Sequence, residues 1–474
     1  MKSEIFVIGG GASGLMAAYG AARTLVEGGS DAQVTVLEKM PRPGRKIMIT
    51  GKGRCNFTNL KDWNEFSAHV RSKSNFVKSA FYNLNSQAVI DFFNEYGLET
   101  VVERGDRAFP VSHHASDVVD TLLNAVSRYG VKVITECEVT DIIRMSDGFK
   151  VNTSDGHEHR CRKLIIATGG LSYPGTGSTG DGYGWAEALG HSIKPCFPSL
   201  TALVPEGYKS MEELVSRGKG HIDRSTPLTE YGQSLNGIQL KNIGLSAIIE
   251  GCEAESEFGD IDFTDGGIEG PVGFQVSRKC VKAIINGSKV VLRVDMKHGI
   301  PLEDVTVRVK SLWDEVLKDP RSRGKSDKEK CRILLGKMMP WDLIPAFIAA
   351  NPEIIKVERK AGTKDRHGKY SVGASKTFVN LSMIAKAMKQ WDFNIAGFVG
   401  YERCVVTAGG VSTDDMVAKT MESRVAPGLY FCGEVVDIDS DTGGYNLQTA
   451  FSTGYLAGQS AAKALISATG FDNN

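Results

Sequence analysis

The sequence has no excess of charge of either sign and no closely spaced cysteines. Its 474 residues contain 56 Lys and Arg and 56 Asp and Glu, so the formal net charge is zero. A neutral chain carries no global field that would favour nucleic acid or an anionic membrane. The nine cysteines are scattered and form no C-x-x-C pair. This pattern argues against a metal site, a dithiol redox centre and a disulfide scaffold, and it suits a reducing cytoplasm.

Long apolar runs and internal repeats are also absent. No stretch is long enough to span a membrane, and the N-terminus leads directly into a predicted strand, which leaves no room for a signal peptide. We therefore expect a cytoplasmic protein without a membrane partner. A chain of 474 residues is too long for one compact core, so two or three domains are expected.

A glycine-rich turn near the N-terminus predicts dinucleotide binding. The sequence GGGASG at 9–14 follows a predicted buried strand at 4–8 and precedes a predicted helix at 13–27. A second predicted strand at 33–37 ends at Glu38. This order of strand, turn, helix, strand and acid is the fingerprint of a Rossmann-type fold.

Each part of the turn has a physical role. Gly9 permits the tight turn, Gly11 lets the backbone approach a pyrophosphate, and Gly14 lets the helix pack closely on the sheet. The unpaired N–H groups at the start of the helix can bind the phosphates. Glu38 is expected to accept hydrogen bonds from ribose hydroxyls. A second glycine motif, at 175–180, follows a predicted loop and is not interpreted as another nucleotide fold.

The nucleotide fold is predicted to be split, within an α/β protein. Its parts are residues 1–190 and 404–474. Residues 191–300 and 350–403 are assigned to a β-rich substrate or cap domain, because residues 192–300 are rich in glycine and β-branched residues. Residues 301–349 have helical spacing and predict a small helical insert.

Three further segments favour FAD over NAD. Segment 44–59 has glycines for close backbone approach and places Arg45 and Lys46 near phosphates. Segment 167–170 is a strand end where the backbone passes close to a cofactor. Segment 433–448 opens a predicted helix whose dipole can face the pyrimidine edge of a flavin.

These segments resemble the HI0933-like family of FAD-dependent oxidoreductases, also called the BaiN or YhiN family. The matching stretches are GRKIMITGKGRCNFTN (44–59), ATGG (167–170), TGSTGDGY (176–183), VTAGGVS (406–412) and GEVVDIDSDTGGYNLQ (433–448). In the insert, FTDGGIEGP at 263–271 resembles a family FTHxGxSGP segment. There, Asp265 and Glu269 replace the usual His and Ser.

The resemblance implies a split FAD-binding Rossmann-like domain of the GR2 type, interrupted by a β-rich domain and a small helical insert. With the motifs, it gives the expected FAD contacts, among which the backbone of Val139 meets the adenine. The expected cofactor-binding residues are Gly9, Gly11, Ala12, Ser13, Gly14, Glu38, Lys39, Arg45, Lys46, Cys55, Asn56, Val139, Ala167, Thr168, Gly169, Gly433, Glu434, Gly444, Asn446, Leu447 and Gln448.

The predicted activity is a reductase that passes hydride from NAD(P)H through FAD to an activated, enone-like C=C bond of a small molecule. The FAD motifs, together with a family branch that reduces enone-type steroid intermediates, motivate this hypothesis. No catalytic residue is assigned. The candidates by residue type for a proton donor are Tyr173, Tyr183, His113, His114 and Tyr445.

Three alternatives stay open. The first is a flavoprotein of the fumarate reductase or ketosteroid type. The second is an RNA-modifying flavoprotein, suggested by six Lys and Arg against two acids at 356–369. Taken alone, that stretch is more typical of a solvated loop, so a nucleic-acid partner is not expected. The third is a redox sensor that binds FAD without turnover. The sequence leaves the oligomeric state open.

Overall fold

The computed structural model describes residues 4–210, 220–359, 363–364, 370–371 and 375–471. The chain divides into two compact units. The first combines Met1–Leu200 with Tyr401–Asn474, and the second is the intervening Thr201–Gly400. The two ends of the chain therefore build one unit together. The predicted domain limits at 190, 300, 350 and 403 stay predictions.

The first unit is built on a seven-stranded sheet of order β24-β25-β26-β10-β1-β2-β6. The run from β26 to β6 is parallel, and β24 and β25 extend it as antiparallel edge strands. The predicted strands at 4–8 and 33–37 are confirmed as β1 and β2, whose residues are all buried, as in a sheet covered on both faces. The strands are β1 (Ile5–Ile8), β2 (Val34–Leu37), β6 (Lys132–Ile134), β10 (Lys163–Ile166), β24 (Met416–Val417), β25 (Glu422–Ser423) and β26 (Leu429–Phe431).

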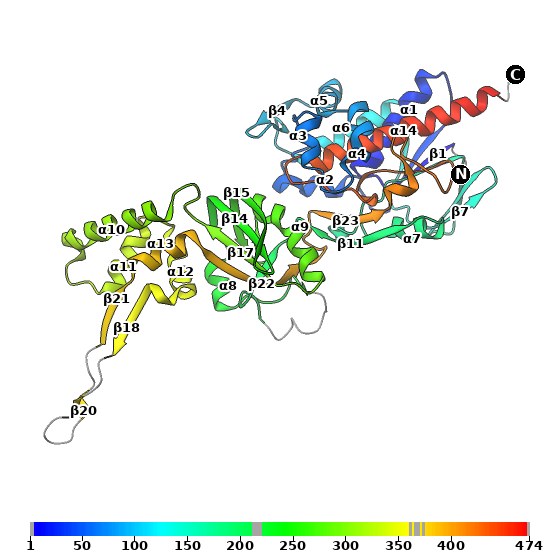
Figure 1. The fold of residues 1–474 in the computed structure, drawn as a ribbon. Coiled ribbons are helices and arrows are strands. Elements are labelled where there is room, and N and C mark those ends of the chain that lie inside the picture. Colours follow the sequence, from blue (N-terminus) through cyan, green and yellow to red (C-terminus); the bar gives the residue numbers. More distant parts are fainter. Residues whose placement is uncertain (1–3, 211–219, 360–362, 365–369, 372–374, 472–474) are drawn as a thin grey trace. The chain divides into compact units, whose positions relative to one another are not determined.

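Two helices from opposite ends of the sequence, α1 (Ala12–Glu27) and α14 (Tyr445–Phe471), lie side by side in this unit (Figure 1, blue and red). Glycines of α14 allow the close approach. A Cβ atom added at Gly458 would lie 1.9 Å from the carbonyl oxygen of Ala17, and one added at Gly454 would lie 2.2 Å from that of Ser13. Helix α1 is thereby fixed between the sheet and the C-terminal helix.

The rest of the first unit consists of shorter elements, including the antiparallel pair β7 and β8. Its other helices are α2 (Arg45–Ile49), α3 (Trp63–Ala68), α4 (Ser74–Asn83), α5 (Ser86–Glu95), α6 (Ala115–Arg128) and α7 (Asp181–Ala188). Its other strands are β3 (Thr58–Asn59), β4 (Thr100–Glu103), β5 (Arg107–Pro110), β7 (Val139–Met145), β8 (Gly148–Thr153), β9 (Glu158–Cys161), β11 (Ile193–Ser199) and β23 (Val406–Val411).

The second unit contains a β-barrel. Because β12 pairs with both β16 and β22, the strand ring β12-β16-β15-β14-β17-β22 closes on itself, and β13 adds to β22. Trp391, Phe263 and Phe393 form a buried aromatic group in it. The strands are β12 (Leu203–Pro205), β13 (His221–Ile222), β14 (Gln239–Ile249), β15 (Cys252–Thr264), β16 (Gly267–Glu269), β17 (Val290–Asp295) and β22 (Trp391–Val399).

The remainder of the second unit is mostly helical. Helices α8 (Glu230–Leu235) and α9 (Pro271–Ile285) lie within the stretch predicted to be β-rich. Helix α9 begins with Pro271 in its first turn and buries Val272, Val276 and Cys280 at helical spacing. The other elements are α10 (Leu302–Lys318), α11 (Asp327–Gly336), α12 (Ile344–Ala350), α13 (Leu381–Lys389) and the strands β18 (Ile355–Arg359), β19 (Thr363–Lys364), β20 (Tyr370–Ser371) and β21 (Ser375–Val379).

Candidate dinucleotide-binding site

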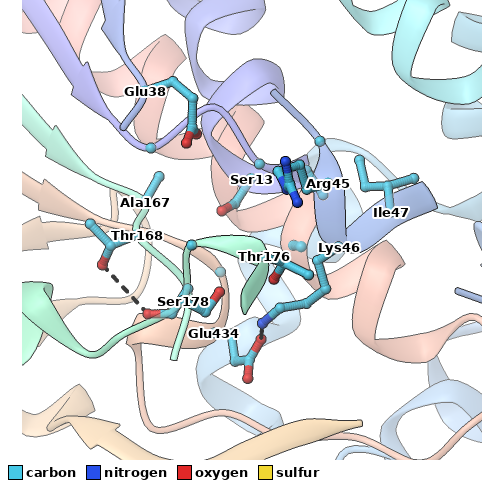
Figure 2. A pocket seen from close by; sticks show the side chains of 18 of the residues that line it. Ser13, Glu38, Arg45, Lys46, Ile47, Ala167, Thr168, Thr176, Ser178 and Glu434 are labelled. Carbon is cyan, nitrogen blue, oxygen red and sulfur yellow. Dashed lines mark hydrogen bonds and ion pairs between the residues drawn. The ribbon is translucent and has the colours of Figure 1, made fainter. Parts of the chain in front are cut away.

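A cavity lies at the carboxyl ends of the parallel strands of the first unit. Open α/β sheets bind their ligands at this edge. Of the 21 predicted cofactor contacts, 16 line the cavity, and Figure 2 labels several of them. The lining contacts are Gly9, Gly11, Ala12, Ser13, Glu38, Lys39, Arg45, Lys46, Val139, Ala167, Thr168, Gly169, Gly433, Glu434, Asn446 and Leu447.

The three glycines of the first turn have different surroundings. A Cβ atom added at Gly9 would lie 2.6 Å from the carbonyl oxygen of Ala167, and one added at Gly14 would lie 1.8 Å from the carbonyl oxygen of Gly9. A Cβ atom at Gly11 would meet no atom within 4 Å. Gly9 and Gly14 are therefore required by packing inside the protein, whereas Gly11 borders open space.

The N-terminus of α1 faces that open space without a side-chain cap. Gly11 occupies the N-cap position, where Ser, Thr, Asp or Asn would satisfy a first-turn amide. The amides of the first turn are thus available to a ligand, and the helix dipole favours an anion. The cradle fits the pyrophosphate of a dinucleotide.

Glu38 follows β2 and is 8% exposed. Its carboxylate accepts a hydrogen bond from the amide of Gly10 at 2.6 Å and one from the amide of Met40 at 2.8 Å. Burial raises the pKa of Glu38, and these two hydrogen bonds oppose the rise only in part. The acid is therefore at the cavity wall, as the motif predicts, and its contact with a ribose stays a prediction.

The pKa of Glu38 leads to a prediction for the ligand-free protein. A pKa raised above its ordinary value of 4.5 means that the folded state binds the proton more tightly than the unfolded state. The stability that this tighter proton binding contributes is fully present below the pKa of Glu38 in the unfolded state. It is lost as pH rises through the pKa of Glu38 in the folded state. We expect the free energy of unfolding of the wild type to fall relative to that of Glu38→Gln over this interval. Urea unfolding at several pH values from 4.5 upward measures it, and parallel profiles would contradict the assignment.

A partly buried ion pair joins two walls of the cavity. The ammonium of Lys46 on α2 lies 2.9 Å from a carboxylate oxygen of Glu434, as the dashed line in Figure 2 shows. The hydroxyl of Ser172 donates to Glu434 and accepts from Lys46 at 2.8 Å. The amide of Thr407 also donates to Glu434, at 2.8 Å. Burial raises the pKa of Glu434, but the Lys46 charge and these hydrogen bonds outweigh it and hold the pKa below its ordinary value.

The other two predicted cations differ in their pairing. Lys39 forms an ion pair with Asp181 at 2.6 Å and also contacts Thr179. No ion pair of Arg45 is found among the described residues, and Figure 2 shows its side chain beside the cavity. Arg45 is therefore the cation best placed to contact a phosphate.

The start of α14 forms a further wall. Asn446, Leu447 and Ala450 line the cavity there. The side chain of Asn446 fastens the preceding loop, because its amide group donates to the carbonyl of Ser440 at 2.8 Å and its oxygen accepts from the amide of Ser440 at 2.9 Å. The position of this helix end is thus set by its own sequence.

Five of the predicted contacts do not line the cavity: Gly14, Cys55, Asn56, Gly444 and Gln448. The Gln448 side chain is fully buried and bonds to Thr58, Leu84 and Ser452, so its hydrogen bonds are satisfied within the protein.

Asn56 lies beside Gly444, which directly precedes α14, and Cys55 is its neighbour in the chain. Cys55 is fully buried, and burial raises the pKa of its thiol to about 12, so the thiol stays protonated. The side-chain oxygen of Asn56 is buried, has no hydrogen-bond partner among the described residues, and would lie 2.9 Å from a Cβ atom added at Gly444. A contact of these residues with a cofactor stays a prediction.

The cavity also has lining residues that were not among the expected cofactor contacts. Thr176, Gly177 and Ser178 belong to the second glycine motif, which is a short 3-10 turn before α7 and faces the same cavity. Its glycine pattern was the available signal. Thr50 lies within the matching segment 44–59, whereas Arg42 and Trp185 had no signal because they line the cavity only through tertiary packing.

None of the five proton-donor candidates lines the cavity. Tyr445 is buried and stacks on His69 with ring centroids 4.2 Å apart. Burial raises the pKa of Tyr183 well above its ordinary value, which disfavours its ionisation. A proton donor therefore stays unassigned.

No helix among the described residues is long and apolar enough to cross a membrane.

Comparisons with known proteins confirm the predicted resemblance. A model described as the HI0933-like protein Rossmann domain matches residues 3–460. The chain is 30% identical over 462 residues to the 3-dehydro-bile acid delta(4,6)-reductase of Clostridium scindens, which covers 97% of this chain and 99% of the relative. It is 29% identical over 465 residues to the ribosomal RNA dihydrouridine synthase of Haemophilus influenzae, again covering 97% and 99%.

Among solved structures, the 3-ketosteroid delta1-dehydrogenase of Sterolibacterium denitrificans matches with a TM-score of 0.50 and 11% identity, covering 98% of this chain and 100% of the other. At this identity the likeness concerns the fold. It agrees with the predicted α/β class, in which a Rossmann-type domain is combined with a β-rich domain.

Proposed function

Because the chain belongs to the HI0933-like family of flavoprotein oxidoreductases, we propose that it reduces a C=C bond conjugated to a carbonyl group, with FAD as cofactor and NAD(P)H as hydride donor. The observation that carries the FAD part of the proposal is the uncapped N-terminus of α1 beside the open space at Gly11. When bound, FAD supplies an N5 atom that accepts and donates hydride.

The residues of the chain then have distinct tasks. The first-turn amides of α1 bind the pyrophosphate and Arg45 adds a positive charge. Glu38 would accept hydrogen bonds from the ribose of the cofactor. The Lys46–Glu434 pair holds α2 against the turn that follows β26. The N-terminus of α14 presents its dipole to the ring system, where it stabilises negative charge.

Two relatives support the type of bond. The name of the first specifies a reductase acting on a 3-dehydro-bile acid at delta-4,6 bonds. The name of the second specifies the formation of dihydrouridine, which differs from uridine by two hydrogens across a C=C bond next to a carbonyl. A conjugated C=C bond is common to both reactions. We propose a small-molecule enone as the substrate of this chain.

Anaerobic reduction of the purified protein tests the proposal. We expect NADH or NADPH to bleach the flavin absorbance, and an enone to restore it with loss of its C=C bond. Quinones and fumarate serve as comparison acceptors. A flavin that stays oxidised with both nicotinamides would contradict the donor, and reoxidation by fumarate alone would favour a fumarate reductase. A flavin that is reduced but that no acceptor reoxidises would favour a redox sensor.

A second candidate substrate is a uracil base in RNA. It is favoured by the dihydrouridine synthase relative and by the basic stretch 356–369, which has six Lys and Arg against two acids. Of this stretch, residues 360–362 and 365–369 lie outside the described residues. Incubation of the reduced protein with ribosomal RNA, followed by mass spectrometry of its nucleosides, measures the formation of dihydrouridine. If the uridine content of the RNA is unchanged while a small enone is reduced, the small-molecule enone is favoured as the substrate.

A further inference from the structure

Residues 171–180, here called the cover segment, lie between the dinucleotide cavity and solvent. The segment follows residues 167–170 and leads into α7, which begins at Asp181. On its inner side it lines the cavity, where Figure 2 labels Thr176 and Ser178. Other residues of the same segment are exposed: Pro174, Gly175 and Thr179. One layer of chain therefore separates this part of the cavity from solvent.

The first end of the cover segment is held by buried hydrogen bonds. The amides of Leu171 and Ser172 donate to the hydroxyl oxygen of Thr407 at 2.8 Å and 3.1 Å. Ser172 is fully buried, and its hydroxyl also takes part in the contacts of Lys46 and Glu434. Several buried polar groups would lose their partners if this end moved, so we expect it to stay in place.

The second end is held by a lysine that follows β2. The ammonium of Lys39 lies 2.6 Å from a carboxylate oxygen of Asp181 and also donates to the hydroxyl of Thr179. The side chains of Lys39 and Asp181 are 20% and 36% exposed. Ion pairs that water can reach are weak, because water competes for both partners and the side chains lose conformational entropy. This end can therefore open while the first end stays in place.

The cover segment also packs closely on the turn that carries Lys39. A Cβ atom added at Gly177 would lie 2.8 Å from the Cγ atom of Met40, the residue after Lys39. The backbone of Gly177 has φ 107°, which favours glycine. Lys39 and Asp181 both line the cavity, so their contact joins two residues of its wall.

We propose that Lys39 is a latch that holds the cover segment closed over a bound dinucleotide and opens before FAD enters or leaves. The inference rests on the FAD binding of the proposed function. Because the latch joins two parts of the protein, it holds the free and the FAD-bound forms alike. Its removal raises the open fraction of both forms by the same factor. Association and dissociation then become faster together, and the affinity is nearly unchanged.

The rates of FAD exchange test the latch. Stopped-flow mixing of the flavin-free protein with FAD, followed by flavin fluorescence, gives the association rate. Loss of radiolabelled FAD from the complex into an excess of unlabelled FAD gives the dissociation rate. We expect Lys39→Met to raise both rates about tenfold, as for the loss of one charge-assisted hydrogen bond and one accessible ion pair. The affinity should stay within about threefold of the wild-type affinity, because both rates rise together.

Two further variants identify the contact. Lys39→Met/Asp181→Asn should exchange FAD no faster than Lys39→Met alone, because both substitutions remove the same interaction. Lys39→Arg keeps a charged donor and should exchange FAD within about threefold of the wild-type rates.

Lys150→Met is the matched control. Lys150 pairs with Glu158 at 2.9 Å and is 21% exposed, but it does not line the cavity. It should leave both rates unchanged, and urea unfolding establishes that the flavin-free variants are folded. The latch is overturned if Lys39→Met binds FAD with normal affinity at the wild-type rates. It is also overturned if only dissociation becomes faster, which would indicate a direct contact of Lys39 with FAD. A wild type that binds no FAD would overturn the proposed cofactor as well.

Discussion

Gly11→Ala is expected to weaken FAD binding strongly without unfolding the protein, whereas Gly14→Ala is expected to destabilise the fold itself. The backbone at Gly11 has φ −83°, which any residue can adopt, and a Cβ atom there would point into the space assigned to the pyrophosphate. At Gly14 the Cβ atom would lie 1.8 Å from the carbonyl oxygen of Gly9, so β1 and α1 would have to separate.

We expect Gly11→Ala to lower the affinity for FAD by about 100-fold, or about 2.7 kcal/mol, with an unchanged free energy of unfolding of the FAD-free protein. Gly14→Ala should lower that free energy of unfolding by about 3 kcal/mol. Urea unfolding of the FAD-free variants and fluorescence titration with FAD measure the two effects separately.

Gly184→Ala is the control for these two substitutions, because Gly184 lies within α7 and a Cβ atom there would meet no atom within 4 Å. It should be neutral or should stabilise by up to about 1 kcal/mol, since alanine favours a helix over glycine. If Gly11→Ala binds FAD as tightly as the wild type, the pyrophosphate does not lie at this turn.

The second large effect is expected at the partly buried pair of Lys46 and Glu434. Removing one partner leaves the other charge uncompensated, at a cost of about 3–5 kcal/mol for fully buried pairs. The side chains of Lys46 and Glu434 are 24% and 16% exposed. We therefore expect Lys46→Ala and Glu434→Ala each to lower the free energy of unfolding by about 2–4 kcal/mol. The double variant should lose less than the sum of the two.

The pair also predicts a pH dependence. Because the pKa of Glu434 is held below its ordinary value of 4.5, its contribution to stability is present above the unfolded pKa and is lost as pH falls through the folded pKa. The stability of Glu434→Gln should not show this decrease at low pH. The exposed pair of Arg23 and Glu27 is the control, since Glu27→Ala should cost no more than about 0.5 kcal/mol. Additive losses in the Lys46–Glu434 double variant would contradict the coupling.

The local elements of the nucleotide fold could be predicted from the sequence. Apolar runs and a glycine turn specify β1, α1 and β2 because each pattern acts over a few residues. Such patterns could not predict that β10 pairs with β26 or that Lys46 contacts Glu434. They join segments that only the complete fold brings together.

One predicted contact, Gln448, does not line the cavity for a physical reason. Sequence position gives the neighbourhood of a side chain, but the direction in which it points depends on packing. Gln448 lies in the predicted segment at the start of α14, yet it points to the buried carbonyl of Leu84 rather than to the cavity. Helix α9 was missed because its apolar spacing lies within a stretch rich in glycine and β-branched residues.

The binding of one FAD in the cavity at the carboxyl ends of β1, β2 and β10 is tested most directly by titration. Flavin-free wild type and Gly11→Ala are each titrated with FAD, and flavin fluorescence is followed. We predict that the wild type saturates at one FAD per chain and that Gly11→Ala, although folded, does not saturate in the same range. A wild type that binds no FAD, or a Gly11→Ala variant that binds it equally well, would contradict the assignment of this site.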